Sequence, residues 1–335
     1  MIFLMVIIGG VTRLTESGLS ITEWQPVTGV VPPLSEAQWA AEFERYKEIP
    51  QYRAIHADMT LAEFKGIFFW EYLHRLWGRL IGVAFAVPFL YFLIRGRIPR
   101  RFAPRLAGLF VLGGLQGALG WYMVASGLSH RIEVSQYRLA AHLVAAAVIY
   151  AAMLWVALDL LWPAAAPMHD RRQAQLRRAA TAVVALVLLT LAAGAFVAGL
   201  RAGYIDNTFP LMEGRFVPPG YAQLAPFYRN WFENLSAVQF DHRLLAETTW
   251  LTIALLWLAS LGVTLARRPR LALHALFTMA TLQLGLGIAT LLLVVPLPLA
   301  VTHQAGAMLL MTAAVVARHA LRAPRRVDGA RGAAL

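Results

Sequence analysis

The chain has 335 residues, of which 59% are hydrophobic and 14% are charged, and it contains no cysteine. About 25% charged residues is usual for a soluble domain, so the composition excludes an ordinary soluble protein. The missing cysteine excludes disulfides, thiolate ligands and iron–sulfur clusters. The formal net charge of +12 comes from short arginine clusters, which we interpret as a topology signal and not as a nucleic-acid-binding face.

Long apolar runs predict an all-α integral membrane protein, because a span needs roughly 20 apolar residues. We expect eight transmembrane helices, at about 1–12, 67–94, 106–126, 138–162, 179–200, 240–266, 271–294 and 299–317. The first run is too short to span a membrane and lacks the features of a signal peptide. We therefore expect the true N-terminus to lie upstream.

The arginine clusters predict the orientation of the helices. They lie at 95–105, 171–178, 267–270 and 318–326. The positive-inside rule places them in the cytoplasm, so both termini are expected there, in a multi-pass protein of the cell inner membrane. The long loops 13–66 and 201–239 then face outward. Glu16, Glu23 and Trp24 of the first loop could cap a site, and a solvated loop is equally consistent with the sequence.

Short motifs recur in the two halves of the chain. LHRL at 73–76 parallels DHRL at 241–244, and QGALG at 116–120 parallels QLGLG at 283–287. Both halves begin on the same side of the membrane, which is typical of a parallel repeat about an axis along the membrane normal.

The repeat predicts two pseudo-symmetric four-helix bundles. The expected units are an N-terminal one at 1–162 and a C-terminal one at 179–317, joined by a cytoplasmic linker at 163–178. A basic cytoplasmic tail is expected at 318–335.

Four histidines occupy matching places near the outer ends of predicted helices: His74, His142, His242 and His303. At 1.5 Å per residue they lie roughly 6–12 Å into the membrane. A metal-binding side chain at such a depth is costly and indicates a functional site. The pairs His74 with His142 and His242 with His303 therefore predict two cofactor sites near the outer leaflet.

Two imidazoles on facing helices suit a porphyrin iron. Glycines on the helix between them would let a bulky ring approach the backbone, although small residues also simply pack helices together. These glycines are Gly113, Gly114, Gly117 and Gly120, with Gly285 and Gly287 in the second half.

Other metals fit the pattern less well. Zinc wants three or four ligands, and copper prefers a thiolate or more histidines. We expect no cofactor role for the remaining histidines, which are His56, His130, His169, His274 and His319.

The halves differ three residues before the first histidine of each pair, where Glu71 stands in one half and Gln239 in the other. A carboxylate beside the first site can move protons or stabilise a developing cation. That site is therefore expected to be reactive and the other to carry electrons. The alternative is a structural ion pair between Glu71 and Arg75.

Four arginines lie near the predicted sites: Arg75, Arg138, Arg201 and Arg243. Arginine can bind the propionates of a porphyrin bidentately. The alternative is that they are interfacial anchors whose stems lie along apolar surface.

Over nearly its whole length the chain resembles the heme A synthase family. The similar segments are GGVTRLTESGLSITEW (9–24), EYLHR (71–75), QGALGW (116–121), RLAAH (138–142), DHR (241–243) and THQ (302–304). The resemblance is to the cysteine-free branch of the proteobacterial and mitochondrial type. Another branch has a cysteine pair in the first outer loop.

The resemblance implies an oxidoreductase that converts heme O to heme A. Two successive hydroxylations of the C8 methyl would give an alcohol and then a gem-diol, which loses water to leave a formyl group, with water as the oxygen source. His242 and His303 would ligate a heme b, His74 and His142 would hold the substrate heme, and Glu71 would be the catalytic carboxylate.

The family also implies partners. Heme O would come from heme O synthase, the protoheme farnesyltransferase, and electrons would leave through heme b to an acceptor that the sequence does not identify. Two other functions explain the histidines: a diheme b-type electron-transfer subunit without porphyrin chemistry, and a heme-delivery protein. The electron-transfer subunit does not explain the difference between Glu71 and Gln239, and a delivery protein would release its heme unchanged.

Overall fold

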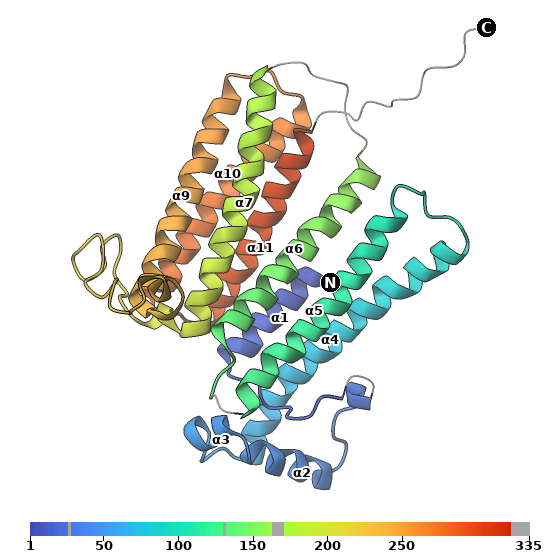
Figure 1. Ribbon diagram of the computed structural model, residues 1–335, viewed down its shortest axis with the longest axis vertical. Helices are drawn as coiled ribbons and strands as arrows, with labels where there is room; N and C mark the ends of the chain where they lie inside the picture. Colours follow the sequence, from blue (N-terminus) through green and yellow to red (C-terminus); the bar gives the residue numbers. More distant parts are fainter. Residues whose placement is uncertain (26–27, 130–131, 163–170, 323–335) are drawn as a thin grey trace.

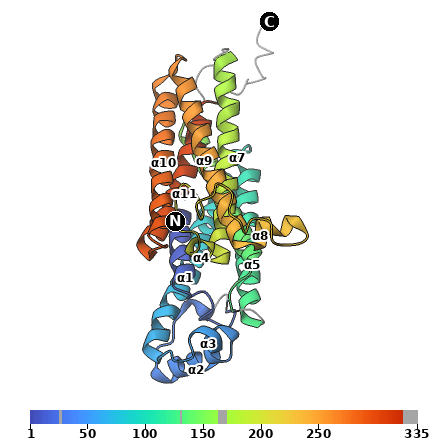
Figure 2. The same ribbon diagram turned by 90° about the vertical axis from the view of Figure 1, so that its left-hand side faces the viewer.

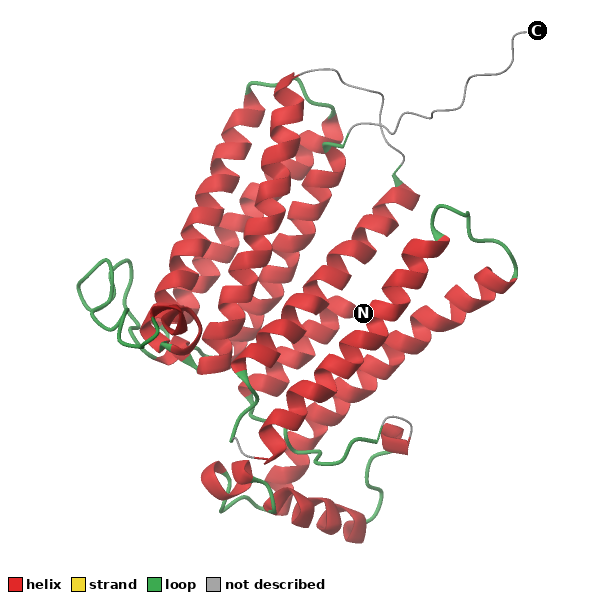
Figure 3. Ribbon diagram, viewed as in Figure 1, coloured by secondary structure: helices red, strands yellow, loops and turns green. Residues whose placement is uncertain are grey.

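The computed structural model describes residues 1–25, 28–129, 132–162 and 171–322. Throughout this part the chain is helical, without strands, and one isolated bridge joins Met212 to Arg215 (Figure 3). The prediction of an all-α protein is confirmed.

Seven of the described helices are long and apolar enough to cross a membrane. They are α4 (Leu61–Ile94), α5 (Ala103–Ser129), α6 (Gln136–Leu161), α7 (Arg171–Leu200), α9 (Leu235–Leu261), α10 (Arg267–Leu292) and α11 (Leu297–Ala320). These helices make the chain a multi-pass membrane protein. The apolar helix α1 (Ile2–Leu14) has 13 residues, so the eighth expected span stays a prediction.

Several helices begin earlier than the apolar runs predict, and at α4 and α9 a polar side chain caps the earlier start. At the start of α4 the Thr60 hydroxyl accepts a hydrogen bond from the amide of Glu63, whose carboxylate accepts from the amide of Thr60. This capping box satisfies two amides that a helix start leaves free. Asn234 caps α9 through the amide of Ala237.

α7 begins within the segment 163–178 that the sequence predicts as a cytoplasmic linker. The helix begins at Arg171, so the second half of that segment is helical. Residues 163–170, and residues 323–335 of the expected tail, lie outside the described part of the chain.

The C-terminal helices α7, α9, α10 and α11 pack around one large core, seen together in Figure 1. Its fully buried members include Val183, Ile253, Leu276 and Met311. The N-terminal helices α1, α4, α5 and α6 share smaller clusters, and α6 and α1 pack against α7 and α11. The two groups therefore meet along α1, α6, α7 and α11.

The first long loop folds into a helical cap and is not simply solvated. It contains η1 (Thr28–Val30), α2 (Glu36–Lys47) and α3 (Pro50–Ile55). Of these, α2 packs against α4 and α3 packs against α5, at the end of the molecule seen in Figure 2. Phe43, Tyr46, Phe64 and Phe68 form its aromatic core. Burial raises the pKa of the Tyr46 hydroxyl, which donates to the Gln51 side chain at 3.0 Å.

The second long loop contains η2 (Ala202–Tyr204), η3 (Phe227–Arg229) and α8 (Asn230–Glu233). The chain crosses between the two loops through α4, α5, α6 and α7, an even number of long helices. Both loops therefore lie on one side of the helices, opposite the start of α7 (Figure 1).

Candidate functional site

Each of the four predicted histidines packs against a glycine of the preceding apolar helix. The pairs are Gly9 and His74 (α1, α4), Gly120 and His142 (α5, α6), Gly194 and His242 (α7, α9), and Gly287 and His303 (α10, α11). A Cβ at Gly120, Gly194 or Gly287 would lie 2.9 Å from the imidazole Cε1, and one at Gly9 would lie 3.3 Å from Nε2. These positions admit the ring because they carry no side chain.

This finding sharpens the expectation about the glycines. Among those named from the sequence, Gly120 and Gly287 meet an imidazole, whereas a Cβ at Gly113, Gly114, Gly117 or Gly285 would meet nothing within 4 Å. Sequence reasoning missed Gly9 and Gly194. The available signal was a glycine inside a run of larger apolar residues on a neighbouring helix.

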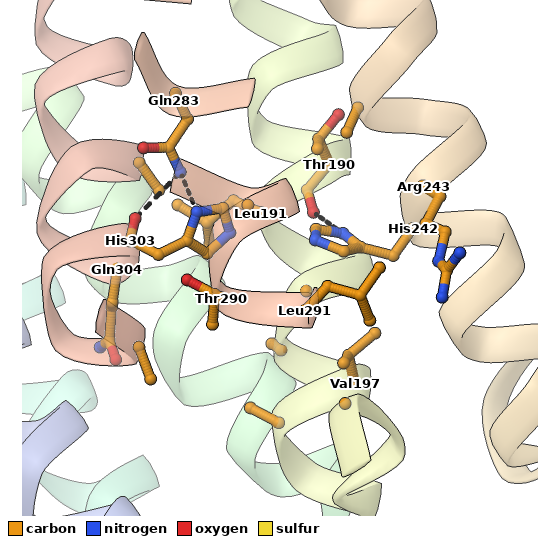
Figure 4. Close-up of a pocket in the computed structure, with 18 of the residues that line it drawn as sticks. Thr190, Leu191, Val197, His242, Arg243, Gln283, Thr290, Leu291, His303 and Gln304 are labelled. Atoms are coloured by element: carbon orange, nitrogen blue, oxygen red, sulfur yellow. Dashed lines mark hydrogen bonds between the residues drawn. The ribbon is translucent and has the colours of Figure 1, made fainter. Parts of the chain in front are cut away.

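The imidazoles of His242 and His303 point toward each other from α9 and α11 (Figure 4). They line a cavity of about 330 Å³ that is mostly apolar and is also lined by Thr190 and Gln283. The Nδ1 of His242 lies 3.1 Å from the carbonyl oxygen of Thr190. A hydrogen on Nδ1 donated to that carbonyl leaves the Nε2 lone pair free for a metal, as is usual for histidine ligands.

A glutamine holds the second histidine of each pair in the same way. Gln283 Nε2 lies 2.9 Å from the carbonyl oxygen of His303 and 3.1 Å from its Nδ1. Gln116 Nε2 makes the same two contacts with His142, at 2.9 and 3.1 Å. These contacts restrict ring rotation. The sequence had shown both glutamines as part of the repeat but had not given them a role.

The first pair is also brought together. His74 on α4 and His142 on α6 are close enough to interact electrostatically, as are His242 and His303. The pairing of the four histidines around two cofactors stays a prediction.

Glu71 is buried, with 2% of its surface exposed, and its carboxylate accepts hydrogen bonds from both the membrane helix and the first outer loop. One oxygen pairs with Arg75 at 2.6 Å. The other accepts from the Ser20 hydroxyl and the Ile21 amide, both at 2.8 Å. The ion pair weighed as an alternative is therefore present, and it sits one helical turn from His74.

Gln239 occupies the corresponding place in the other half. Its Oε1 accepts from Arg243 at 2.8 Å, and its Nε2 donates to the carbonyl oxygens of Ala202 and Ile205 at 2.9 and 2.6 Å. Glu71 and Gln239 therefore both tie the following arginine to an outer loop.

The four arginines considered for propionates all bind protein groups. Arg75 and Arg243 donate to loop carbonyls. Arg138 donates to the Tyr122 carbonyl at 2.6 Å and lies over its ring. Arg201 pairs with Glu16 and Glu133, each at 2.5 Å. Which of these arginines would bind propionates stays a prediction.

The remaining described histidines have ordinary partners. His56 contacts the Tyr46 hydroxyl at 2.6 Å, His274 accepts from Trp257 at 2.8 Å, and His319 lies 3.1 Å from Asp159. His130 and His169 lie outside the described residues. Within the described ranges no group of three or more His, Asp or Glu side chains is arranged to hold a metal ion.

Comparisons with known proteins agree over almost the whole chain. A family model for cytochrome oxidase assembly protein matches residues 1–315. A heme A synthase of Nitrosospira multiformis is 54% identical over 96% of this chain and 90% of its own length. Heme A synthases of Rhodospirillum centenum and Rhodopseudomonas palustris are 54% and 50% identical, each over 97% of this chain and over 86% and 88% of their own lengths. No solved structure matches the chain.

Proposed function

The chain belongs to the heme A synthase family, and we infer that it is a membrane oxidoreductase that converts heme O to heme A. The observation that carries this inference is the pair of bis-histidine sites with unequal neighbours, Glu71 beside one and Gln239 beside the other. An electron-transfer subunit would need two sites but not a carboxylate beside one of them.

We propose that the C-terminal pair holds a resident heme b. Two opposed imidazoles backed by Gly194 and Gly287 suit the two axial positions of a porphyrin iron. Zinc would require a third ligand, and no such cluster occurs among the described residues. When bound, heme b supplies one-electron transfer. His242 and His303 would ligate its iron, and Gln283 would hold the His303 ring in place.

The N-terminal pair, His74 and His142, is proposed to hold heme O by its iron, which fixes the porphyrin between α4 and α6. The substrate methyl becomes a formyl group by gaining one oxygen from water and losing four protons and four electrons in total. The first hydroxylation gives the alcohol, the second gives the gem-diol, and loss of water gives the product.

Glu71 is proposed as the catalytic carboxylate. Its bonds to Arg75, Ser20 and Ile21 hold it in one orientation beside His74, so little reorganisation would be needed during the reaction. There it would stabilise positive charge that develops at the methyl carbon, or take a proton from the attacking water.

We further propose that the chain comprises two pseudo-symmetric four-helix units, 1–162 and 179–317, with α1 as the first helix of the first unit. The matched glycine, glutamine and arginine contacts support this repeat. Both termini would be cytoplasmic and both sites would lie toward the outer, periplasmic side of the bacterial inner membrane, as the arginine clusters predict.

The proposed partners follow from the chemistry. Heme O must be supplied by a reaction that attaches an isoprenoid chain to protoheme, which is the work of heme O synthase. The four electrons must pass to an electron acceptor outside this chain.

The test is the mass and number of hemes extracted from the purified protein. For the wild type we expect one heme b and, after turnover, heme A. Glu71→Gln should retain both hemes and produce no heme A, a loss of about 100-fold or more if general acid–base or electrostatic catalysis is removed.

Ser20→Ala is the matched control, because it removes one hydrogen bond to Glu71 and keeps the carboxylate. It should still produce heme A. If it loses activity as completely as Glu71→Gln, Glu71 acts by positioning the loop. Two unmodified b-type hemes in the wild type would support the electron-transfer function, and heme O released unchanged would support delivery.

A further inference from the structure

The seam between α9 and α10 is closed by side chains below the C-terminal histidines. Trp250 on α9 donates its indole N–H to the Thr281 hydroxyl on α10 at 3.1 Å. Its ring also lies 6.4 Å from that of Phe277, which stacks on Trp257 at 4.4 Å. Ala280 beside Thr281 is buried. A porphyrin in that half could not leave sideways through this seam without displacing Trp250.

The matching positions between α4 and α5 are all glycine. Counting from His74 and His242, Trp250 corresponds to Gly82; counting from Gln116 and Gln283, Thr281 corresponds to Gly114 and Ala280 to Gly113. Gly82, Gly113 and Gly114 are exposed, and a Cβ at any of them would meet nothing within 4 Å. Gly117, which corresponds to Leu284, is open in the same way.

Aromatic contacts frame this open stretch at both ends. On the inner side Phe110 of α5 packs against Phe85 and Phe89 of α4, with ring centroids 6.3 and 6.0 Å apart. On the outer side Trp121 of α5 lies 6.5 Å from Trp24 of the outer loop. The eleven-residue interval from Phe110 to Trp121 is roughly 16 Å long at 1.5 Å per residue.

The glycines lie on the path from the seam to the first histidine pair. Gly82 is eight residues after His74 and three before Phe85, so it shares their helix face. On α5, Gly113 and Gly117 flank Gln116, which contacts His142. The seam between α4 and α5 at these glycines is therefore built from the same helix segments that carry His74 and Gln116.

We propose that heme O enters, and heme A leaves, sideways through this glycine-lined seam between α4 and α5, directly from the lipid phase. The proposal rests on the proposed function and names the substrate route of the same site. An isoprenoid-bearing heme is a lipid-like molecule whose tail can stay in the bilayer while the porphyrin passes between the helices. The resident heme must instead stay, and its matching seam is closed by Trp250 and Thr281.

The test places the residues that close the α9–α10 seam at the matching positions of the α4–α5 seam. A second variant makes the opposite exchange. Gly82→Trp combined with Gly114→Thr should slow heme O uptake by reduced protein in lipid nanodiscs at least about tenfold, which is a barrier increase of about 1.4 kcal/mol. Uptake is followed by the absorbance of bis-histidine heme, so no turnover is needed. The C-terminal heme b spectrum reports that the variant has folded.

Two controls distinguish the effect of adding a bulky side chain from the effect of where it is added. Gly108→Trp adds the same ring to an exposed, open position elsewhere on α5 and should take up heme O at the wild-type rate. Trp250→Gly with Thr281→Gly should open the second seam, so that resident heme b exchanges at least about tenfold faster with added isotope-labelled heme b. Should the doubly glycine-substituted protein fold poorly, Trp250→Ala alone is expected to shift exchange in the same direction.

Wild-type uptake by the Gly82→Trp and Gly114→Thr variant would overturn the route. Equal slowing by Gly108→Trp would overturn it as well, since position would then not matter. The outcome is separable from the proposed function: a wild type that binds heme O through this seam but makes no heme A would refute the function and leave the route standing.

Discussion

Glu71 and Gln239 show how one residue position can be chosen by its local backbone. The first outer loop presents a hydroxyl and an amide, and a carboxylate accepts from both. The second presents two carbonyl oxygens, and an amide nitrogen donates to both. A buried polar group left without its partner is costly, so neither residue can replace the other freely. The difference has a structural cause as well as the proposed catalytic one.

The glycines behind the histidines give a prediction at single-residue resolution. Gly287→Ala would place a Cβ 2.9 Å from the His303 ring, whereas Gly285→Ala on the same helix would meet nothing. Forcing the ring aside is an overpacking cost of about 1–3 kcal/mol, so heme b affinity should fall roughly 5- to 150-fold in the first variant. Heme titration of the apoprotein measures it. Equal affinities for the two variants would contradict the contact.

The sequence predicted the four histidines and their pairing because an imidazole inside an apolar run is rare and conspicuous. It did not predict which residue each ring touches. Gly120 and Gly117 look alike in the sequence, yet only Gly120 meets His142. That distinction depends on how α5 is rotated against α6, which apolar periodicity defines only to within a broad face.

At the scale of elements, each outer loop is tied to a membrane helix by the arginine that follows the first histidine of each pair. Arg75 on α4 donates to the carbonyls of Ile21 and Glu23 at 2.8 and 3.1 Å. Arg243 on α9 donates to the carbonyls of Asp206 and Thr208 at 2.5 and 2.7 Å. The loops are therefore held directly over the two histidine sites.

Removing either arginine should loosen only its own loop. Arg75→Met is expected to speed amide hydrogen exchange in residues 17–25 at least about tenfold, because hydrogen bonds to charged groups contribute about 1.5–3 kcal/mol each. Arg243→Met should do the same for 205–209 and leave 17–25 unchanged. Exchange followed by mass spectrometry gives both. If either variant sped exchange in both loops, the two arginines would not hold their loops independently.

The apolar runs predicted the position of every long helix but not the polar residues at which the helices begin. α4 begins at Leu61 and not at 67, because the capping box of Thr60 and Glu63 starts it above the membrane. The same extension supports the cap formed by α2 and α3, whose core residues such as Tyr46 lie in a segment without a long apolar run. Capping and loop packing depend on single polar residues, and a mean hydropathy over many residues does not reveal them.

At the scale of the whole molecule, ion pairs join the two helix groups at both ends. On the side of the long loops Glu133 pairs with Arg13 at 2.8 Å and with Arg201 at 2.5 Å. On the opposite side Asp159 near the end of α6 pairs with His319 of α11 and with Arg322, two residues after the end of that helix. Ion pairs at both ends of the helices favour a fixed distance and orientation between the proposed substrate site and the proposed electron-carrying site.

The orientation of the molecule in the membrane can be tested cleanly because the chain has no cysteine. Single cysteines at exposed positions would be Ala37→Cys in α2, Glu213→Cys in the second long loop and Arg97→Cys between α4 and α5. An even number of long helices separates the first two positions, so both should lie on one side of the membrane, which the arginine clusters predict to be the outer side. A membrane-impermeant thiol reagent should therefore label these two in spheroplasts and should label the third only after permeabilisation. Labelling of Arg97→Cys in sealed spheroplasts would place the arginine clusters outside and reverse the proposed position of both heme sites.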